Sequence, residues 1–210
     1  MSANRGDPIA FSEGYPHEDI HIQQARKNGE ELGVIDPTPA VGSLIQFIAR
    51  TTGAKSIVEV GTGSGVSGLW AFQGAATDST LTSIDSEREH LASARTVFEE
   101  AGIAPQRFRL ITGSIVEIVG KLADANYDLM IIRNPQDLLE VVQESFRLLK
   151  AHGTLLIDNV MDSGRVADPT QRDFETISRR DAIKAIKEDS RWSSALLSVG
   201  GGVLVATKLS

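Results

Sequence analysis

The sequence contains no cysteine, which excludes disulfide bonds and thiolate metal sites and is compatible with a reducing cytosol. It also lacks any apolar run that approaches the roughly 20 residues of a membrane-spanning helix. Its N-terminus does not show the basic and then apolar pattern of a secretion signal. We therefore expect a cytoplasmic protein with no membrane partner.

Positive charge is scarce as well, since 21 Lys and Arg face 28 Asp and Glu for a net charge of -7. No cluster of Lys and Arg stands out, which argues against nucleic acid as the main partner. The 210 residues suffice for one α/β domain with a substantial core, and no repeat, low-complexity segment or linker divides them. We expect a single domain over residues 1–210. Its N-terminal segment, 1–37, is expected to act as a lid, a subunit contact or a loose arm.

Strands and helices alternate along the chain after residue 38, whereas residues 1–13 are polar and expected to be poorly ordered. The predicted strands are 57–60, 81–85, 108–111, 127–132, 154–157, 195–199 and 203–206. The strand 127–132 is almost wholly apolar, as expected of a strand buried on both faces. Such alternation predicts a mostly parallel sheet covered by helices on both faces, with one antiparallel strand from the final hairpin. Ligands of these sheets bind outside the carboxyl ends of the strands.

A glycine loop follows the first predicted strand and leads into a helix. The loop is Gly61, Thr62, Gly63, Ser64 and Gly65, with Glu59 two residues before it and Ser67 in the helix that follows. Glycines let the backbone turn sharply and approach a ligand, and a helix N-terminus suits a carboxylate or a phosphate. The acid at Glu59 can accept hydrogen bonds from the loop or from an ammonium group. The other interpretation is a glycine-rich turn without a ligand.

The next strands also end in polar residues. Asp85 comes about 20 residues after the loop, where a carboxylate can accept both ribose hydroxyls of a nucleoside. We include its neighbour Ser86 in this candidate site, and Gly113 with Ser114 is expected to flank an adenine. Asp85 could equally be an exposed acid in a turn, and Gly-Ser is an ordinary turn sequence.

These features together resemble the cation-dependent small-molecule O-methyltransferases, a group that includes catechol and caffeoyl-CoA O-methyltransferases. The similarity covers nearly the whole chain after the first dozen residues. It depends on the E-x-G-x-G stretch 58–67, on Ile84-Asp85, on the strand 127–132 and on the stretch 155–166, which contains Asp158-Asn159. The resemblance implies a Rossmann-like fold, S-adenosyl-L-methionine (SAM) as cofactor and a homodimer. It also implies a divalent ion that binds two Asp, one Asn and the acceptor's hydroxyls and lowers the hydroxyl pKa.

The sequence departs from that family pattern at the first metal ligand. The family has an Asp where Arg133 stands, and a guanidinium has only donors. Gln136 replaces a Lys that relatives use as a base, and Ser114 stands where an Asp is usual. Asp158 and Asn159 remain, either as functional groups or as a capping turn. We therefore predict no metal here and assign catalysis to Arg133, Asp158 and Asn159, with Arg133 in place of the cation and donating to the substrate oxyanion.

No residue is a convincing general base in the sequence. His17 or His21 could serve only if the N-terminal segment folds over the pocket. Asn134 or Asp137 could reach the site if the fourth strand ends later than predicted.

Three functions remain open at this point. The first is a SAM-dependent O-methyltransferase that acts on a small, phenolic or catechol-like hydroxyl acceptor without the metal. The second is a non-catalytic SAM-binding protein of the same fold. The third is a Rossmann dehydrogenase, which is disfavoured because Val66 stands where the dinucleotide fingerprint G-x-G-x-x-G needs its third glycine.

Overall fold

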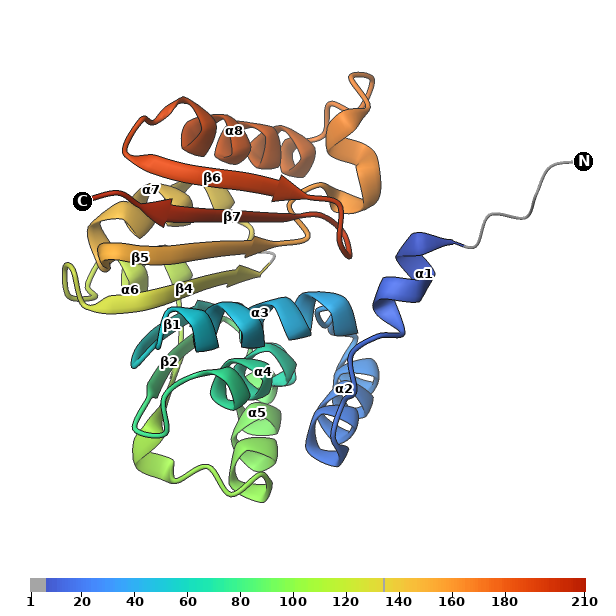
Figure 1. Ribbon diagram of the computed structural model, residues 1–210, viewed down its shortest axis with the longest axis vertical. Coiled ribbons are helices and arrows are strands. Elements are labelled where there is room, and N and C mark those ends of the chain that lie inside the picture. The colour runs from blue at the N-terminus through green and yellow to red at the C-terminus, as the bar shows by residue number, and fades with distance from the viewer. Residues whose placement is uncertain (1–6, 134) are drawn as a thin grey trace, which may run out of the picture.

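The protein folds around one seven-stranded sheet in the order β3-β2-β1-β4-β5-β7-β6 (Figure 1). The computed structural model describes residues 7–133 and 135–210, so the predicted contribution of Asn134 lies outside the described residues. The strands are β1 Ser56–Val60, β2 Thr80–Asp85, β3 Phe108–Thr112, β4 Tyr127–Arg133, β5 Leu149–Asp158, β6 Trp192–Leu197 and β7 Val203–Lys208. The first five pair in parallel, and β7 runs antiparallel to both β5 and β6. The predicted mostly parallel sheet with one antiparallel strand is confirmed.

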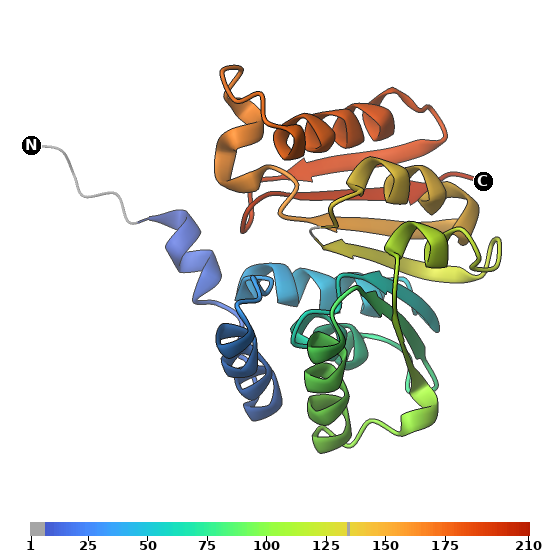
Figure 2. The ribbon, with the colours of Figure 1, turned by 180° about the vertical axis from the view of Figure 1, so that it is seen from behind.

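Two layers of helices cover the sheet, as seen from opposite sides in Figures 1 and 2. One layer holds α2 Ile20–Leu32, α3 Pro39–Thr51, α4 Val66–Gly74 and α5 Arg88–Glu100, and the other holds α6 Ile115–Val119, α7 Leu138–Leu148 and α8 Phe174–Glu188. Each layer packs on its own apolar cluster against opposite faces of the central strands. Leu129 and Ile131 of β4 join one cluster and Met130 and Ile132 join the other, because successive strand residues point to opposite faces. Among the described residues, no helix is long and apolar enough to cross a membrane.

The N-terminal segment is partly helical, contrary to the expectation for residues 1–13. Asp7 caps the short helix α1 Pro8–Glu13, which buries none of its side chains and projects from the body in Figures 1 and 2. The Glu13 carboxylate then accepts from Thr38 Oγ1 at 2.9 Å and from the Ala40 backbone N–H at 3.0 Å. These two hydrogen bonds to Glu13 therefore tie the end of the arm to the first turn of α3, although the residues are 25 and 27 positions apart.

The C-terminal half differs from the prediction in strand length. β5 begins at Leu149, where the sequence suggested a turn at His152, and His152 takes a left-handed φ of 63° inside the strand. The register of β4 against β5 shifts between Tyr127 and Leu129, which accommodates the extra residues. The predicted loop 161–169 contains a 3-10 turn, Asp162–Ala167. Pairing with neighbouring strands decided these lengths, and local sequence does not encode that pairing.

Candidate functional site

A cavity of about 610 Å³ lies at the carboxyl ends of the parallel strands. Its walls come from the 33–36 loop, which joins α2 to α3, and from the ends of β1, β2, β3 and β4. The lining residues are Gly33, Val34, Ile35, Gly61, Gly63, Asp85, Ser86, Glu87, His90, Gly113, Ser114, Ile115, Arg133, Pro135, Gln136 and Asp137. The cavity thus gathers many of the predicted cofactor-binding residues at one edge of the sheet.

The glycine loop is the tightest part of the cavity wall. Gly61 has a φ of 87°, and a Cβ there would lie 2.2 Å from the backbone oxygen of Arg133. Gly63 has a φ of 54°, and its Cβ would lie 2.9 Å from Val34 Cγ1. Both positions combine a left-handed backbone with no space for a side chain, so only glycine fits them. The close approach of β1, β4 and the 33–36 loop depends on these two residues.

Asp85 organises the adjoining corner of the cavity. Its Oδ2 accepts from the Gly63 N–H at 3.0 Å, and its Oδ1 accepts from the Glu87 N–H at 2.9 Å. The same Oδ1 lies 3.1 Å from Nδ1 of His90, a cavity residue in the first turn of α5. The carboxylate therefore ties the glycine loop to the start of α5.

The remaining residues predicted around the loop lie behind it rather than on the cavity wall. Glu59 is fully buried and accepts hydrogen bonds from Ser67 Oγ and, at 2.5 Å, from Ser83 Oγ. Thr62 Oγ1 pairs with Ser83 Oγ at 2.6 Å. Burial raises the pKa of Glu59 against the opposing effect of these hydroxyls. Both hydroxyl partners of Glu59 therefore come from neighbouring elements, Ser67 from the start of α4 and Ser83 from β2.

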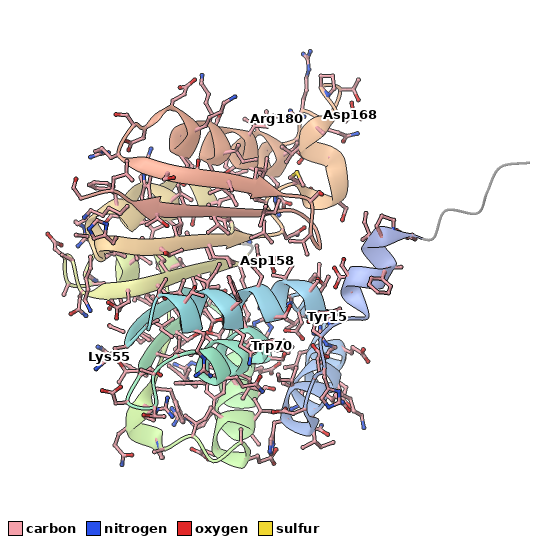
Figure 3. All side chains as sticks on the ribbon, in the orientation of Figure 1. Tyr15, Lys55, Trp70, Asp158, Asp168 and Arg180 are labelled. Carbon is pink, nitrogen blue, oxygen red and sulfur yellow. The ribbon has the colours of Figure 1, made fainter. Side chains whose placement is uncertain are left out.

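Arg133 connects four parts of the site through its guanidinium. Nη2 donates to the Ile35 carbonyl at 2.5 Å, and Nη1 donates to Ser67 Oγ at 3.4 Å. Nη1 also lies 4.0 Å from Oδ1 of Asp36, and Nε lies 3.5 Å from Oδ2 of Asp158. Burial raises the pKa of both Asp36 and Asp158, while the positive charge of Arg133 opposes that rise. Figure 3 labels Asp158 at the end of β5.

A smaller cavity of about 350 Å³ adjoins the larger one and shares Ile35, Pro135 and Gln136 with it. Its other walls are Leu138, Asn159, Asp162, Glu175, Ser178 and Arg179. Asn159 lines this smaller cavity, whereas Arg133 lines only the larger one. The backbone of Asn159 takes a left-handed φ of 54°, and its N–H donates to Asp158 Oδ1 at 2.7 Å.

The described residues do not supply the donor set that the family's divalent ion needs. A guanidinium occupies the place of the first carboxylate ligand and pairs with the second, and it offers only N–H donors. The donor chemistry at this place therefore differs from the two Asp and one Asn that the family resemblance implies for the ion.

The structure also places the residues considered as bases. Neither His17 nor His21 lines either cavity. Asp137 lines the larger one, and Gln136 lines both. The N-terminal helices thus bring no histidine to the cavity wall in the described geometry.

Sequence reasoning missed Asp36 and His90. Asp36 lies in the N-terminal segment 1–37 and belongs to no predicted site, yet both its oxygens lie 2.8 Å from the donor Ser64 Oγ. His90 follows Asp85 by five residues, and a helix starting between them predicts that the two side chains can meet. No comparable local signal existed for Asp36, because its partners are 28 and about 100 positions away.

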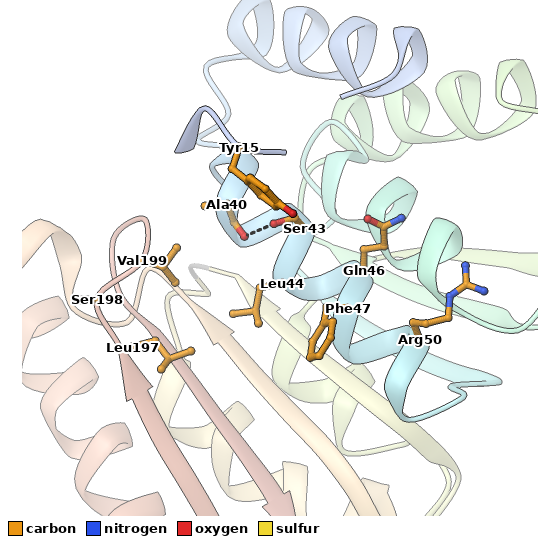
Figure 4. Close-up of a pocket in the computed structure, with 10 residues that line it drawn as sticks. All are labelled: Tyr15, Ala40, Ser43, Leu44, Gln46, Phe47, Arg50, Leu197, Ser198 and Val199. Carbon is orange, nitrogen blue, oxygen red and sulfur yellow. Dashed lines mark hydrogen bonds between the residues drawn. The ribbon is translucent and has the colours of Figure 1, made fainter. Parts of the chain in front are cut away.

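A separate apolar groove lies between α3 and the end of β6 with the turn that follows it (Figure 4). Tyr15, Leu44 and Phe47 lie across it from Leu197, at the end of β6, and Val199, in the β6–β7 turn. Phe47 is 64% exposed and Tyr15 is 83% exposed. This groove contains none of the predicted site residues.

Comparison with known proteins agrees with this architecture. The model of a family described as O-methyltransferase matches residues 19–209. A Mycobacterium tuberculosis protein named "Probable O-methyltransferase" is 44% identical over 207 residues, which covers 98% of this chain and 92% of that protein.

Solved structures agree on the fold. A Corynebacterium glutamicum protein has a TM-score of 0.88 at 30% identity and covers 96% of this chain and 95% of that one. The Streptomyces achromogenes O-methyltransferase TomG, solved in complex with SAM, has a TM-score of 0.86 at 24% identity over 96% of this chain and 95% of its own. Because the family model spans most of the sequence, the chain belongs to the O-methyltransferase family.

Proposed function

We propose that the protein is a SAM-dependent O-methyltransferase that methylates a hydroxyl of a small, phenolic or catechol-like acceptor without the divalent ion of its relatives. The observation that carries the metal-free part is the buried pair of Arg133 Nε and Asp158 Oδ2 at 3.5 Å. Membership of the O-methyltransferase family supports the reaction class and removes the reason to consider a dehydrogenase.

Electrostatics favours Arg133 over a divalent ion at this place. A divalent cation about 4 Å from a guanidinium would be repelled by about 8 kcal/mol at an effective dielectric constant of 20. Asp158 could offset part of this, but a guanidinium does not give up its charge to a metal as a carboxylate ligand does. Arg133 offsets one of the two nearby carboxylates, Asp36 and Asp158, so at most one negative charge is left for a divalent ion, against the two of the family's Asp ligands.

The two cavities suggest how the substrates are divided. SAM supplies an electrophilic methyl group, and the larger cavity offers the glycine loop and Asp85 to hold it. The smaller cavity would then take the acceptor, with Asn159 on its wall and with Ile35, Pro135 and Gln136 between the two. Donation by Arg133 to the acceptor oxyanion stays a prediction that the smaller cavity does not support, because Arg133 lines only the larger one.

The test is methyl transfer to a phenolic acceptor in EDTA, in magnesium and in Arg133→Asp. We expect activity that ignores EDTA and falls in Arg133→Asp without added metal, because that change leaves two adjacent carboxylates without a cation. Arg109→Asp is the matched control, since Arg109 is exposed on β3 and lines neither the two cavities nor the groove. Activity of the native protein that depends on magnesium would refute metal independence.

A non-catalytic SAM-binding protein is the alternative. It is favoured by the absence of a histidine on the wall of the smaller cavity among the described residues. SAM binding without methyl transfer to any phenol or catechol tested, under every metal condition, would support it. We also propose a homodimer, for which the groove beside α3 offers an apolar surface.

A further inference from the structure

The guanidinium of Arg133 lies against the glycine loop at the inner end of the larger cavity. A Cβ on Gly63 would lie 3.2 Å from Nη1 of Arg133 and 3.5 Å from Oδ1 of Asp36. Nη1 also reaches Ser67 Oγ, in the first turn of α4, at 3.4 Å. This charge therefore meets the loop at the point where β1 passes into α4.

Arg133 keeps part of its donor capacity in this position. A guanidinium has five N–H donors. The Ile35 carbonyl takes one at 2.5 Å, and Ser67 Oγ takes another at the long distance of 3.4 Å. Nε has no hydrogen-bond acceptor among the described residues, although Asp158 lies 3.5 Å away as an ion-pair partner. Nε is buried and faces Asp158, so an anion in the cavity would meet the fork formed by Nη1 and Nη2, whose four N–H groups make only these two hydrogen bonds with the described residues.

Two carboxylates fix the direction of this fork. Asp158 holds the Nε side at 3.5 Å, and Asp36 faces Nη1 at 4.0 Å. Asp36 is itself held, because both its oxygens accept from Ser64 Oγ at 2.8 Å. Arg133 and Asp36 keep only 3% and 4% of their side-chain surface exposed, so neither is a freely moving surface group.

We propose that Arg133 binds the carboxylate at the amino-acid end of SAM, with Asp36 and Asp158 as positioning residues. This inference rests on the proposed SAM-dependent function. The carboxylate is the one anionic group of SAM, and guanidinium binds carboxylates through paired, charge-assisted hydrogen bonds. Arg133 lines the larger cavity and not the smaller one, which agrees with a partner on the cofactor rather than on the acceptor. The N-terminus of α4 beside it favours the same charge.

The test is calorimetric binding of three ligands that differ at this end: SAM, decarboxylated SAM and 5′-methylthioadenosine. Decarboxylated SAM lacks only the carboxylate, and methylthioadenosine lacks the whole amino-acid end. The proteins are the native chain, Arg133→Met, Arg133→Lys, Asp36→Asn and the control Arg109→Met. Arg109 is exposed on β3 and lines neither the two cavities nor the groove.

We expect the native protein to prefer SAM over decarboxylated SAM by about 10-fold or more, the effect of one hydrogen bond between charged groups. Arg133→Met should abolish this preference while it leaves the affinity for methylthioadenosine within about threefold. Arg133→Lys should keep part of the preference, because a point charge remains without the fork. Asp36→Asn should reduce the preference, and Arg109→Met should retain it in full.

Equal affinity of the native protein for SAM and decarboxylated SAM would overturn the assignment, whether or not any variant folds. So would an undiminished preference in folded Arg133→Met. Native protein that binds none of the three ligands would instead refute the proposed SAM-dependent function, so the two failures are distinguishable.

Discussion

Replacement of Asp85 by Ala tests the proposed ribose contact. The carboxylate offers about four lone-pair sites. Three donors already lie within reach of it, namely the Gly63 N–H, the Glu87 N–H and His90 Nδ1. About one site remains for a ribose hydroxyl, rather than the two that the sequence suggested. One charge-assisted hydrogen bond contributes about 1.5–3 kcal/mol, so we expect SAM binding to weaken about 10- to 150-fold.

The same change should also lower stability. The N–H groups of Gly63 and Glu87 lose their acceptor, but water can enter from the cavity, so we expect a loss of about 2 kcal/mol. For a chain of this size that corresponds to a decrease in Tm of about 4–8 °C. Asp78→Ala is the control, because Asp78 is 67% exposed and its pair with Lys55 at 3.4 Å contributes little.

The assay is calorimetry with SAM and with 5′-methylthioadenosine at a temperature well below the Tm of the variant. Both ligands carry the ribose, so Asp85→Ala should weaken both by the same factor. Unchanged SAM affinity in the folded variant would refute the assignment. If Asp85→Ala weakened the binding of SAM alone, Asp85 would contact the amino-acid end of SAM rather than the ribose.

Three further predictions concern the rest of the molecule. Gly42→Ala should lower the free energy of unfolding by about 1–3 kcal/mol, seen as a lower Tm, because its Cβ would lie 2.1 Å from Nε1 of buried Trp70, the residue labelled in Figure 3. Burial raises the pKa values of Asp36, Glu59 and Asp158, so the folded state binds more protons than the unfolded state above the ordinary values of 3.8 and 4.5. Stability should therefore fall as pH rises from about 4 through the raised values, and denaturant titrations should show a flatter fall in Glu59→Gln. Phe47→Asp should shift the expected dimer to monomer in sedimentation at micromolar protein, whereas Val116→Asp should not, and a monomeric native protein would contradict the dimer.

The sequence by itself determined the order of the elements and the edge at which the site lies. Period-2 and near-continuous apolar runs identified the strands, and the rule that parallel strands share a carboxyl edge predicted that Gly61, Asp85 and Gly113 would meet. The replacement of an acid by Arg133 was visible only through the family resemblance, which places the family's first metal ligand at the end of the strand 127–132.

Only the tertiary structure decided what those polar groups contact. Glu59 and Ser67 belong to the loop sequence, yet they bond to each other behind the wall, with Ser83 as a second partner of Glu59. Asp36 has no local pattern, and its partners Ser64 and Arg133 come from distant positions that sheet assembly brings together. The length of β5 likewise depends on its neighbours β4 and β7. Periodicity reports which side chains are buried, but the partner of a buried charge is set by the packing of segments far apart in the chain.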